Sequence, residues 1–187
     1  MNVRAKTLDR LKQDALIADF YRDSLTGIDA ITGTIFGATA DFLAVNVFKD
    51  SGAADGVSVF WLHDLTRVRW NHLPARSVSI LRNATGFAAP PTPLLQLSNV
   101  REAIASMYKA FGHVCLYAER LDSDICYIGT VAEIDDHHVV LNELKSLDRN
   151  GLASIMLPLD EITRLDAGGD YERDLEIVTK QALLGKP

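Results

Sequence analysis

Short runs of apolar residues, separated by turn-forming residues, make up most of the chain. Over 57–61 Val57, Val59 and Trp61 alternate with Ser58 and Phe60, so the predicted strand has one apolar face and one that is only partly polar. Two stretches, 4–15 and 99–111, instead space their apolar residues as one face of a helix does, and Gly112 suits the end of the second. A final helix is expected after Asp170. The pattern therefore predicts a mainly β protein with flanking helices.

The strands are predicted to form two groups of five, and each group follows a helix. In the first half the strands are expected at 17–21, twice within 30–50 and twice within 57–70. In the second half they are expected at 113–120, 124–134, 137–144, 152–159 and 162–166, with a turn at 148–151. One further strand of the first half is expected at 76–83.

A proline-rich stretch separates the two halves of the chain. Pro90, Pro91 and Pro93 follow one another closely, which favours a stiff, extended connector. The domains are therefore predicted as an N-terminal domain, a connector and a C-terminal domain, at 1–88, 89–97 and 98–187.

Short motifs recur in the two halves at an almost constant offset. Gly33 and Gly129 lie 96 residues apart, and the segments 62–68 and 159–165 match at an offset of 97. A glycine lets a strand bend sharply, as the strands of a very small barrel must. A helix followed by five short, bent strands is the layout of an Sm or SH3 barrel. The sequence thus predicts two tandem Sm/SH3-like five-stranded barrels, each preceded by a short helix.

The second copy resembles the first motif of Sm proteins, including their bacterial Hfq branch. Gly129, Asp135 and the apolar run at 139–141 carry this resemblance. Sm proteins place an asparagine after the aspartate to hold a uridine base, whereas this chain has His137 and His138. Histidine rings can stack on an unpaired base, so the resemblance implies that Asp135, His137 and His138 contact RNA.

A second resemblance covers 119–172. This segment is similar to a set of bacterial proteins of unassigned function that share the pattern E-R-x-D-x-D-V/I-C-Y/W-I-G, followed later by E-I-T-R-V/L-D. The resemblance supports the domain assignment and implies no activity.

Charge is distributed unevenly along the chain. The net charge of the 187 residues is −6, yet residues 113–187 alone hold 7 Lys or Arg and 15 Asp or Glu, a net charge of −8. No acidic residue lies between Asp64 and Glu102, a stretch that holds several arginines. An acidic chain repels a phosphate polymer, so RNA binding is possible but disfavoured. The basic stretch is expected either to bind single-stranded nucleic acid or to dock on the acidic half of the same or a neighbouring copy.

Two groups of cationic residues are further candidates for ligand contact. Arg67, Arg69 and Trp70 combine positive charge with an aromatic ring, as single-strand binders do. The pair Thr66 and Arg67 recurs in the second copy, where it includes Arg164. These threonine–arginine pairs are expected to hold the last strand of each copy, for instance by an ion pair to Asp64 or Glu161, with a ligand-binding role as the alternative.

Two cysteines are expected to remain free thiols. A turn at 122–123 would place Cys126 opposite Glu119 and Cys115 opposite Thr130, too far apart for a disulfide. Free thiols fit a reducing compartment, and the polar N-terminus lacks the apolar centre of a signal peptide. The chain also has no apolar run long enough to span a membrane. We therefore expect a cytoplasmic protein without a membrane partner.

No arrangement of residues indicates catalysis. The serines have no histidine at a recognisable spacing, no phosphate-binding loop is present, and adjacent histidines on a strand point apart. The sequence therefore predicts no enzyme activity, no metal and no cofactor. The leading hypothesis is an interaction or scaffold protein that self-associates through barrel edge strands. The alternative is an RNA-binding regulator of the Sm/Hfq type.

Overall fold

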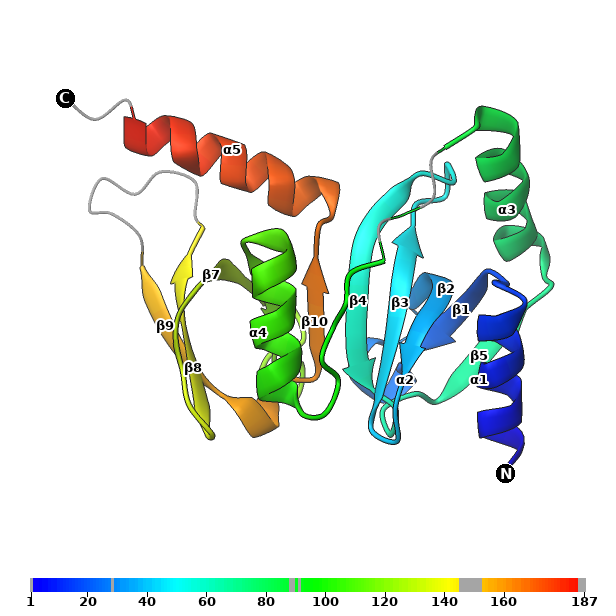
Figure 1. Ribbon diagram of the computed structural model, residues 1–187, viewed down its shortest axis with the longest axis horizontal. Coiled ribbons are helices and arrows are strands. Elements are labelled where there is room, and N and C mark those ends of the chain that lie inside the picture. The colour runs from blue at the N-terminus through cyan, green and yellow to red at the C-terminus, as the bar shows by residue number, and fades with distance from the viewer. Residues whose placement is uncertain (1, 28, 88–89, 91, 145–152, 185–187) are drawn as a thin grey trace. The chain divides into compact units, whose positions relative to one another are not determined.

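The computed structural model (Figure 1) describes residues 2–27, 29–87, 90, 92–144 and 153–184. The chain divides into two compact units, Met1–Thr92 and Pro93–Pro187, and the division falls within the stretch expected as a connector. Each unit contains five strands together with helices, so the prediction of a mainly β protein with flanking helices is confirmed. In the described part of the chain, no helix has the length and apolar character needed to cross a membrane.

Unit 1 is an antiparallel sheet with strand order β5-β1-β2-β3-β4. Its elements are α1 (Val3–Gln13), β1 (Ala18–Tyr21), α2 (Asp23–Thr26), β2 (Ala30–Ala38), β3 (Phe42–Phe48), β4 (Ala54–Trp61), β5 (Arg67–Trp70) and α3 (Leu73–Thr85). Leu8 and Leu11 of α1 belong to the same buried cluster as Phe20, Leu43 and Phe60 of the sheet. The apolar stripe of the first helix therefore closes the core of this unit.

Unit 2 is an antiparallel sheet with strand order β10-β6-β7-β8-β9. Its elements are α4 (Val100–Phe111), β6 (Val114–Tyr117), β7 (Cys126–Ile134), β8 (His138–Glu143), β9 (Ser154–Pro158), the 3-10 helix η1 (Leu159–Glu161), β10 (Arg164–Ala167) and α5 (Asp170–Leu184). The Asn99 side chain accepts the Glu102 N–H at the start of α4, and Gly112 ends that helix with a φ of +79°. The predicted turn at 148–151 lies outside the described residues.

The two units have the same strand order. In each, the fifth strand pairs with the first, and the first, second, third and fourth follow in sequence. The register shifts in both between the second and third strands, at Ile35/Gly37 in unit 1 and at Val131/Glu133 in unit 2. These bulges are separated by the same 96 residues as Gly33 and Gly129. The offset read from the sequence therefore relates equivalent positions of the two sheets.

Neither sheet is closed among the described residues. The fourth and fifth strands lie at opposite ends of the strand order of each unit and do not pair with each other. The expected closure into two five-stranded barrels is therefore not confirmed.

The expected strand at 76–83 is wrong, because this segment lies within helix α3. Its apolar and polar residues alternate locally, but stronger helix signals flank it: Pro74 lies in the first turn and Gly86 ends the helix with a φ of +67°. Val78 is buried with Ala75, one helical turn away, whereas Ile80 is 62% exposed. The burial thus follows a helical period of three to four residues rather than a period of two.

The predicted register of β6 and β7 is also wrong. Cys126 lies opposite Tyr117, and Cys115 lies opposite Ile128. The chain leaves β6 before Glu119, whose N–H donates to the Thr163 hydroxyl at 3.2 Å, so a longer connection replaces the expected tight hairpin. Both cysteines are free thiols, as expected, and Cys115 is buried.

We expect Gly129→Ala to lower the free energy of unfolding of the protein by about 1–3 kcal/mol, because overpacking of this kind has that cost. A Cβ at Gly129 would lie 2.5 Å from the carbonyl oxygen of Asn142 on the neighbouring strand. Urea denaturation followed by circular dichroism measures the change. Glu133→Ala, at an exposed position of the same strand, is the control. Equal stability of the two variants would show that the close approach of the strands does not require glycine.

Candidate functional site

The first group of predicted contact residues forms the turn between β7 and β8. One carboxylate oxygen of Asp135 accepts the backbone N–H groups of His137 and His138, each at 2.7 Å. These hydrogen bonds, the one from His137 first, hold the pKa of Asp135 below its ordinary value. The Asp135 side chain therefore stabilises its own turn and positions the two histidines that follow.

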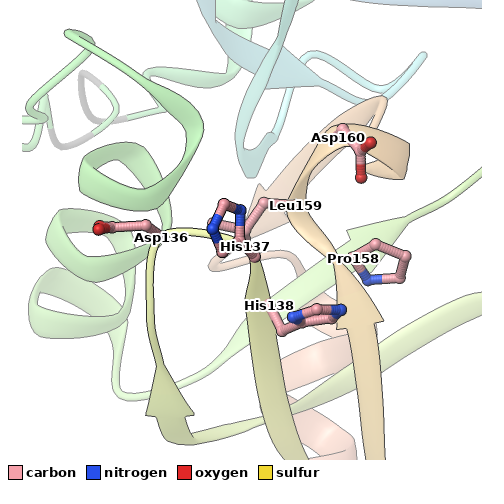
Figure 2. Close-up of a pocket in the computed structure, with 6 residues that line it drawn as sticks. All are labelled: Asp136, His137, His138, Pro158, Leu159 and Asp160. Carbon is pink, nitrogen blue, oxygen red and sulfur yellow. The ribbon is translucent and has the colours of Figure 1, made fainter.

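The two histidines lie at a surface hollow of about 420 Å³ (Figure 2). Its other walls come from the end of β9 and from η1, and the lining residues are Asp136, His137, His138, Pro158, Leu159 and Asp160. Strand pairing brings these segments together, because His138 lies opposite Pro158 and the Leu159 N–H donates to the His137 carbonyl at 2.7 Å. The sequence patterns identified the histidines but not the opposite wall, which depends on the pairing of β8 with β9.

Two carboxylates flank this hollow. Asp136 and Asp160 are both exposed, and Figure 2 shows the Asp136 carboxylate directed away from the two imidazoles. Asp136 pairs weakly with Arg101 of α4 at 3.5 Å. Within the described ranges, no three His, Cys, Asp or Glu side chains are arranged as ligands of one metal ion. The hollow therefore suits a neutral or cationic group better than a phosphate.

The second group of predicted contact residues lies on β5 of unit 1. The Arg67 guanidinium bonds to both carboxylate oxygens of Asp23, with Nη2 at 2.7 Å from Oδ1 and Nε at 2.9 Å from Oδ2. It also stacks 3.5 Å from the centre of the Tyr21 ring. The hydrogen bonds from Arg67 and then from Thr66 lower the pKa of Asp23 to about 2. Arg67 is therefore engaged within its own unit.

Arg69 and Trp70, the other two residues of this group, are exposed. Arg69 forms no ion pair with any residue that the structure describes. These two side chains therefore remain available for a partner, in contrast to Arg67.

The third predicted contact, Arg164 on β10, is mostly buried, with a side chain that is 16% exposed. It lies 3.7 Å from Glu119 and 3.2 Å from Asp166, and it stacks 3.5 Å from the centre of the Tyr117 ring. This burial and pairing favour a structural role for Arg164 over contact with an external ligand.

The threonine–arginine pairs form the same arrangement in both units, which we call the Thr-Arg lock. It consists of Tyr21, Asp23, Thr66 and Arg67 in unit 1 and of Tyr117, Glu119, Thr163 and Arg164 in unit 2. The threonine hydroxyl is 3.0 Å from the tyrosine carbonyl oxygen in each lock, and it accepts the N–H of the acidic residue at 3.2 Å. The lock joins the last strand of each unit to the first, as the sequence led us to expect.

The acidic partners in the lock differ from those named as examples from the sequence. Arg67 pairs with Asp23 rather than Asp64, because the fifth strand runs beside the first and Arg67 lies opposite Tyr21. For the same reason Arg164 pairs with Glu119 rather than Glu161. The sequence does contain a pattern that identifies these acidic partners, because Asp23 and Glu119 are separated by the same 96 residues as Gly33 and Gly129.

Neither a family model, nor a curated protein, nor a solved structure matches this chain. The resemblance to Sm proteins therefore stays a prediction, and the functional argument depends on the geometry described above.

We expect Arg164→Met to destabilise the protein strongly, by about 3–5 kcal/mol, because it removes a buried cation that faces both Glu119 and Asp166. The Glu119 side chain is 2% exposed, so water cannot replace the arginine. Arg67→Met is the matched variant in unit 1, where both partners are partly exposed, and its effect should be much smaller. Thermal and urea unfolding of both variants test this, and equal losses would contradict the assigned difference in burial.

Proposed function

We propose that this protein is a non-enzymatic interaction or scaffold protein, built from two Sm-like units, that assembles with further copies of itself. The observation that carries the proposal is the shared construction of the units: the same strand order, the same bulge and the same Thr-Arg lock. A helix, five short antiparallel strands and a turn before the last strand match the layout of a small barrel. This likeness supports a tandem repeat of Sm/SH3-like barrels.

The edges β5 and β9 are the surfaces that we propose for assembly. In the strand order of its own unit, β5 pairs with β1 alone and β9 pairs with β8 alone. An edge strand presents N–H and C=O groups that another strand can satisfy. Met156 of β9 is 63% exposed, and Trp70 of β5 is also exposed, so both edges offer apolar surface.

Charge favours head-to-tail pairing over pairing of like edges. Strand β5 lies in the stretch between Asp64 and Glu102 that holds no acidic residue, whereas residues 113–187 carry a net charge of −8. Pairing the basic edge of one copy with the acidic unit of the next brings opposite charges together. Such a heterologous contact forms a ring when its rotation closes.

RNA binding is the alternative, and the exposed Arg69 and Trp70 favour it. The carboxylates of Asp136 and Asp160 beside the two histidines oppose it, because they repel the phosphate backbone at the Sm-like turn. Self-association therefore remains the leading proposal.

We expect the wild-type protein to form a defined oligomer, with a mass that is a multiple of 20.6 kDa, and Met156→Lys to shift it to smaller species. A lysine on an edge strand opposes pairing because the incoming strand would have to desolvate its charge. Size-exclusion chromatography with light scattering measures the masses. Leu121→Lys is the control, since Leu121 is 61% exposed in the same unit but lies outside the strands. A monomeric wild type, or equal disruption by both variants, would contradict the proposal.

The same chromatography separates the two candidate functions when the protein is purified without nuclease. Absorbance at 260 and 280 nm shows whether nucleic acid accompanies the protein. Copurifying RNA that dissociates at high salt would favour the alternative function, an RNA-binding regulator, because contacts to phosphate weaken steeply as ionic strength rises. An oligomer that is free of nucleic acid and resists salt would favour assembly through strand edges.

A further inference from the structure

The two cysteine side chains lie on one face of unit 2. Cys115 is opposite Ile128 and Cys126 is opposite Tyr117, so the register makes the cysteines diagonal neighbours on adjacent strands. Residues two apart on a strand point to the same face, which places all four side chains together. Cys115 and Ile128 belong to a buried cluster against which Tyr117, Cys126 and Leu175 of α5 pack.

The two thiols differ in exposure and in surroundings. Cys115 is 1% exposed, whereas Cys126 is half-buried at the start of β7. Tyr117, which lies opposite Cys126 on β6, packs together with Cys126 against the buried cluster that contains Cys115. The guanidinium of Arg164, stacked on the Tyr117 ring, adds positive charge near Cys126.

These contacts separate the acidities of the two thiols. The adjacent Cys115 thiol, with help from Arg164 and Tyr117 and against the effect of burial, lowers the pKa of Cys126 to about 7. The adjacent Cys126 thiol, followed by burial and the charge of Asp166, raises the pKa of Cys115 well above its ordinary value. At neutral pH about half of the Cys126 side chain is therefore ionised, and the buried Cys115 keeps its proton.

We propose that Cys126 and Cys115 form a peroxide-reactive dithiol, in which Cys126 is oxidised first and Cys115 then closes a disulfide. The Cys126 thiolate attacks one oxygen of hydrogen peroxide, so that an S–O bond forms, the O–O bond breaks and hydroxide leaves. The Cys115 sulfur then attacks the Cys126 sulfur of the sulfenic acid. The S–S bond forms, the S–O bond breaks, and the oxygen leaves with the Cys115 proton. Two thiols are oxidised to one disulfide, and one peroxide is reduced to two waters.

Closing the disulfide requires a small shift of the backbone. Diagonal neighbours on antiparallel strands lie about 7–8 Å apart, whereas the Cα atoms of a disulfide lie about 4.4–6.8 Å apart. Cys126 is the first residue of β7 and follows the connection 118–125, in which residues 120–125 are all exposed. The required shift therefore falls at one end of the β6–β7 ladder, where Cys126 pairs with Tyr117.

The dithiol is specific to unit 2. In unit 1 the equivalent positions, 96 residues earlier, are Asp19 and Ala30. Asp19 there accepts a hydrogen bond from Thr32 at 2.8 Å and contacts His72 Nε2 at 2.7 Å. The proposed redox chemistry thus requires two cysteines that unit 1 lacks, placed beside Tyr117 and Arg164 of the shared lock.

Treatment of the native protein with hydrogen peroxide, followed by intact-mass and peptide analysis, tests the proposal. We expect the loss of two hydrogen atoms, a Cys115–Cys126 linked peptide, and full reversal by dithiothreitol. In Cys115→Ser the reaction should stop at a Cys126 sulfenic acid that dimedone traps. In Cys126→Ser the remaining Cys115 should not react. An unmodified wild type, sulfinic acid at Cys126 without a disulfide, or wild-type reactivity of Cys126→Ser would overturn the proposal.

The pH dependence of alkylation checks the assigned thiolate separately. We expect the rate of Cys126 modification by iodoacetamide to rise with pH through a midpoint near 7, because the thiolate is the nucleophile and its pKa is lowered to about 7. Removing the neighbouring thiol in Cys115→Ala should move the midpoint upward. The same protein unfolded in urea provides the reference, with a midpoint of about 8.5. A native midpoint equal to that reference would contradict the proposed activation.

Discussion

Each unit depends on the pairing of its first strand with its last. Strands two, three and four each pair with their neighbour in the sequence, so their pairing is comparatively local. The first and fifth strands are remote in sequence: Thr66 bonds to the Tyr21 carbonyl across 45 residues, and Thr163 bonds to that of Tyr117 across 46. Closing so long a loop costs conformational entropy that a pair of short strands repays poorly. The Thr-Arg lock adds hydrogen bonds and an ion pair between these two strands, which are the most remote in sequence.

The two locks share one geometry but differ in environment. In unit 1 the Arg67 side chain is 47% exposed, so solvent screens its pair with Asp23. In unit 2 Arg164 and Glu119 are mostly removed from water, so removing either charge would leave the other buried with less compensation. The buried lock is also adjacent to the thiol pair, since the ring on which Arg164 stacks belongs to Tyr117. In unit 2 the arginine of the lock therefore lies beside a thiol, whereas the equivalent position in unit 1 is Ala30.

The sequence allowed the local features of this fold to be predicted, because they depend on signals within a few residues. The cap at Asn99 and the glycine stop at Gly112 show this for α4. Long-range pairing was harder to predict. The register of Cys126 depends on where the chain leaves β6, and there Glu119 contacts Thr163, which lies just before the distant strand β10. The helix α3 was missed for a different reason, since alternation over a few residues outweighed the proline and glycine that flank it.

For the candidate site, too, the local features could be predicted and the long-range contacts could not. The polar turn with His137 and His138 could be found from its residue types alone, and the hollow forms around it. The opposite wall of the hollow at Leu159 could not be predicted, because only the pairing of β8 with β9 places Leu159 beside the turn. The sequence also did not show which arginines form ion pairs within the protein. Arg67 pairs with Asp23, which lies 44 residues earlier in the chain.

A common framework with divergent side chains explains why the two units can do different things. The lock holds the first and last strands of each unit together at Tyr21 and Tyr117. The residue two positions earlier on the first strand differs between the units. Unit 1 has Asp19 at this position, buried against His72, and unit 2 has Cys115, buried against Cys126. A hydrogen-bonded carboxylate keeps a strand in place without chemical change, whereas a paired thiol can be oxidised and reduced. The shared strand order and lock thus hold a carboxylate in unit 1 at the position where unit 2 holds the thiol for which we propose a redox role.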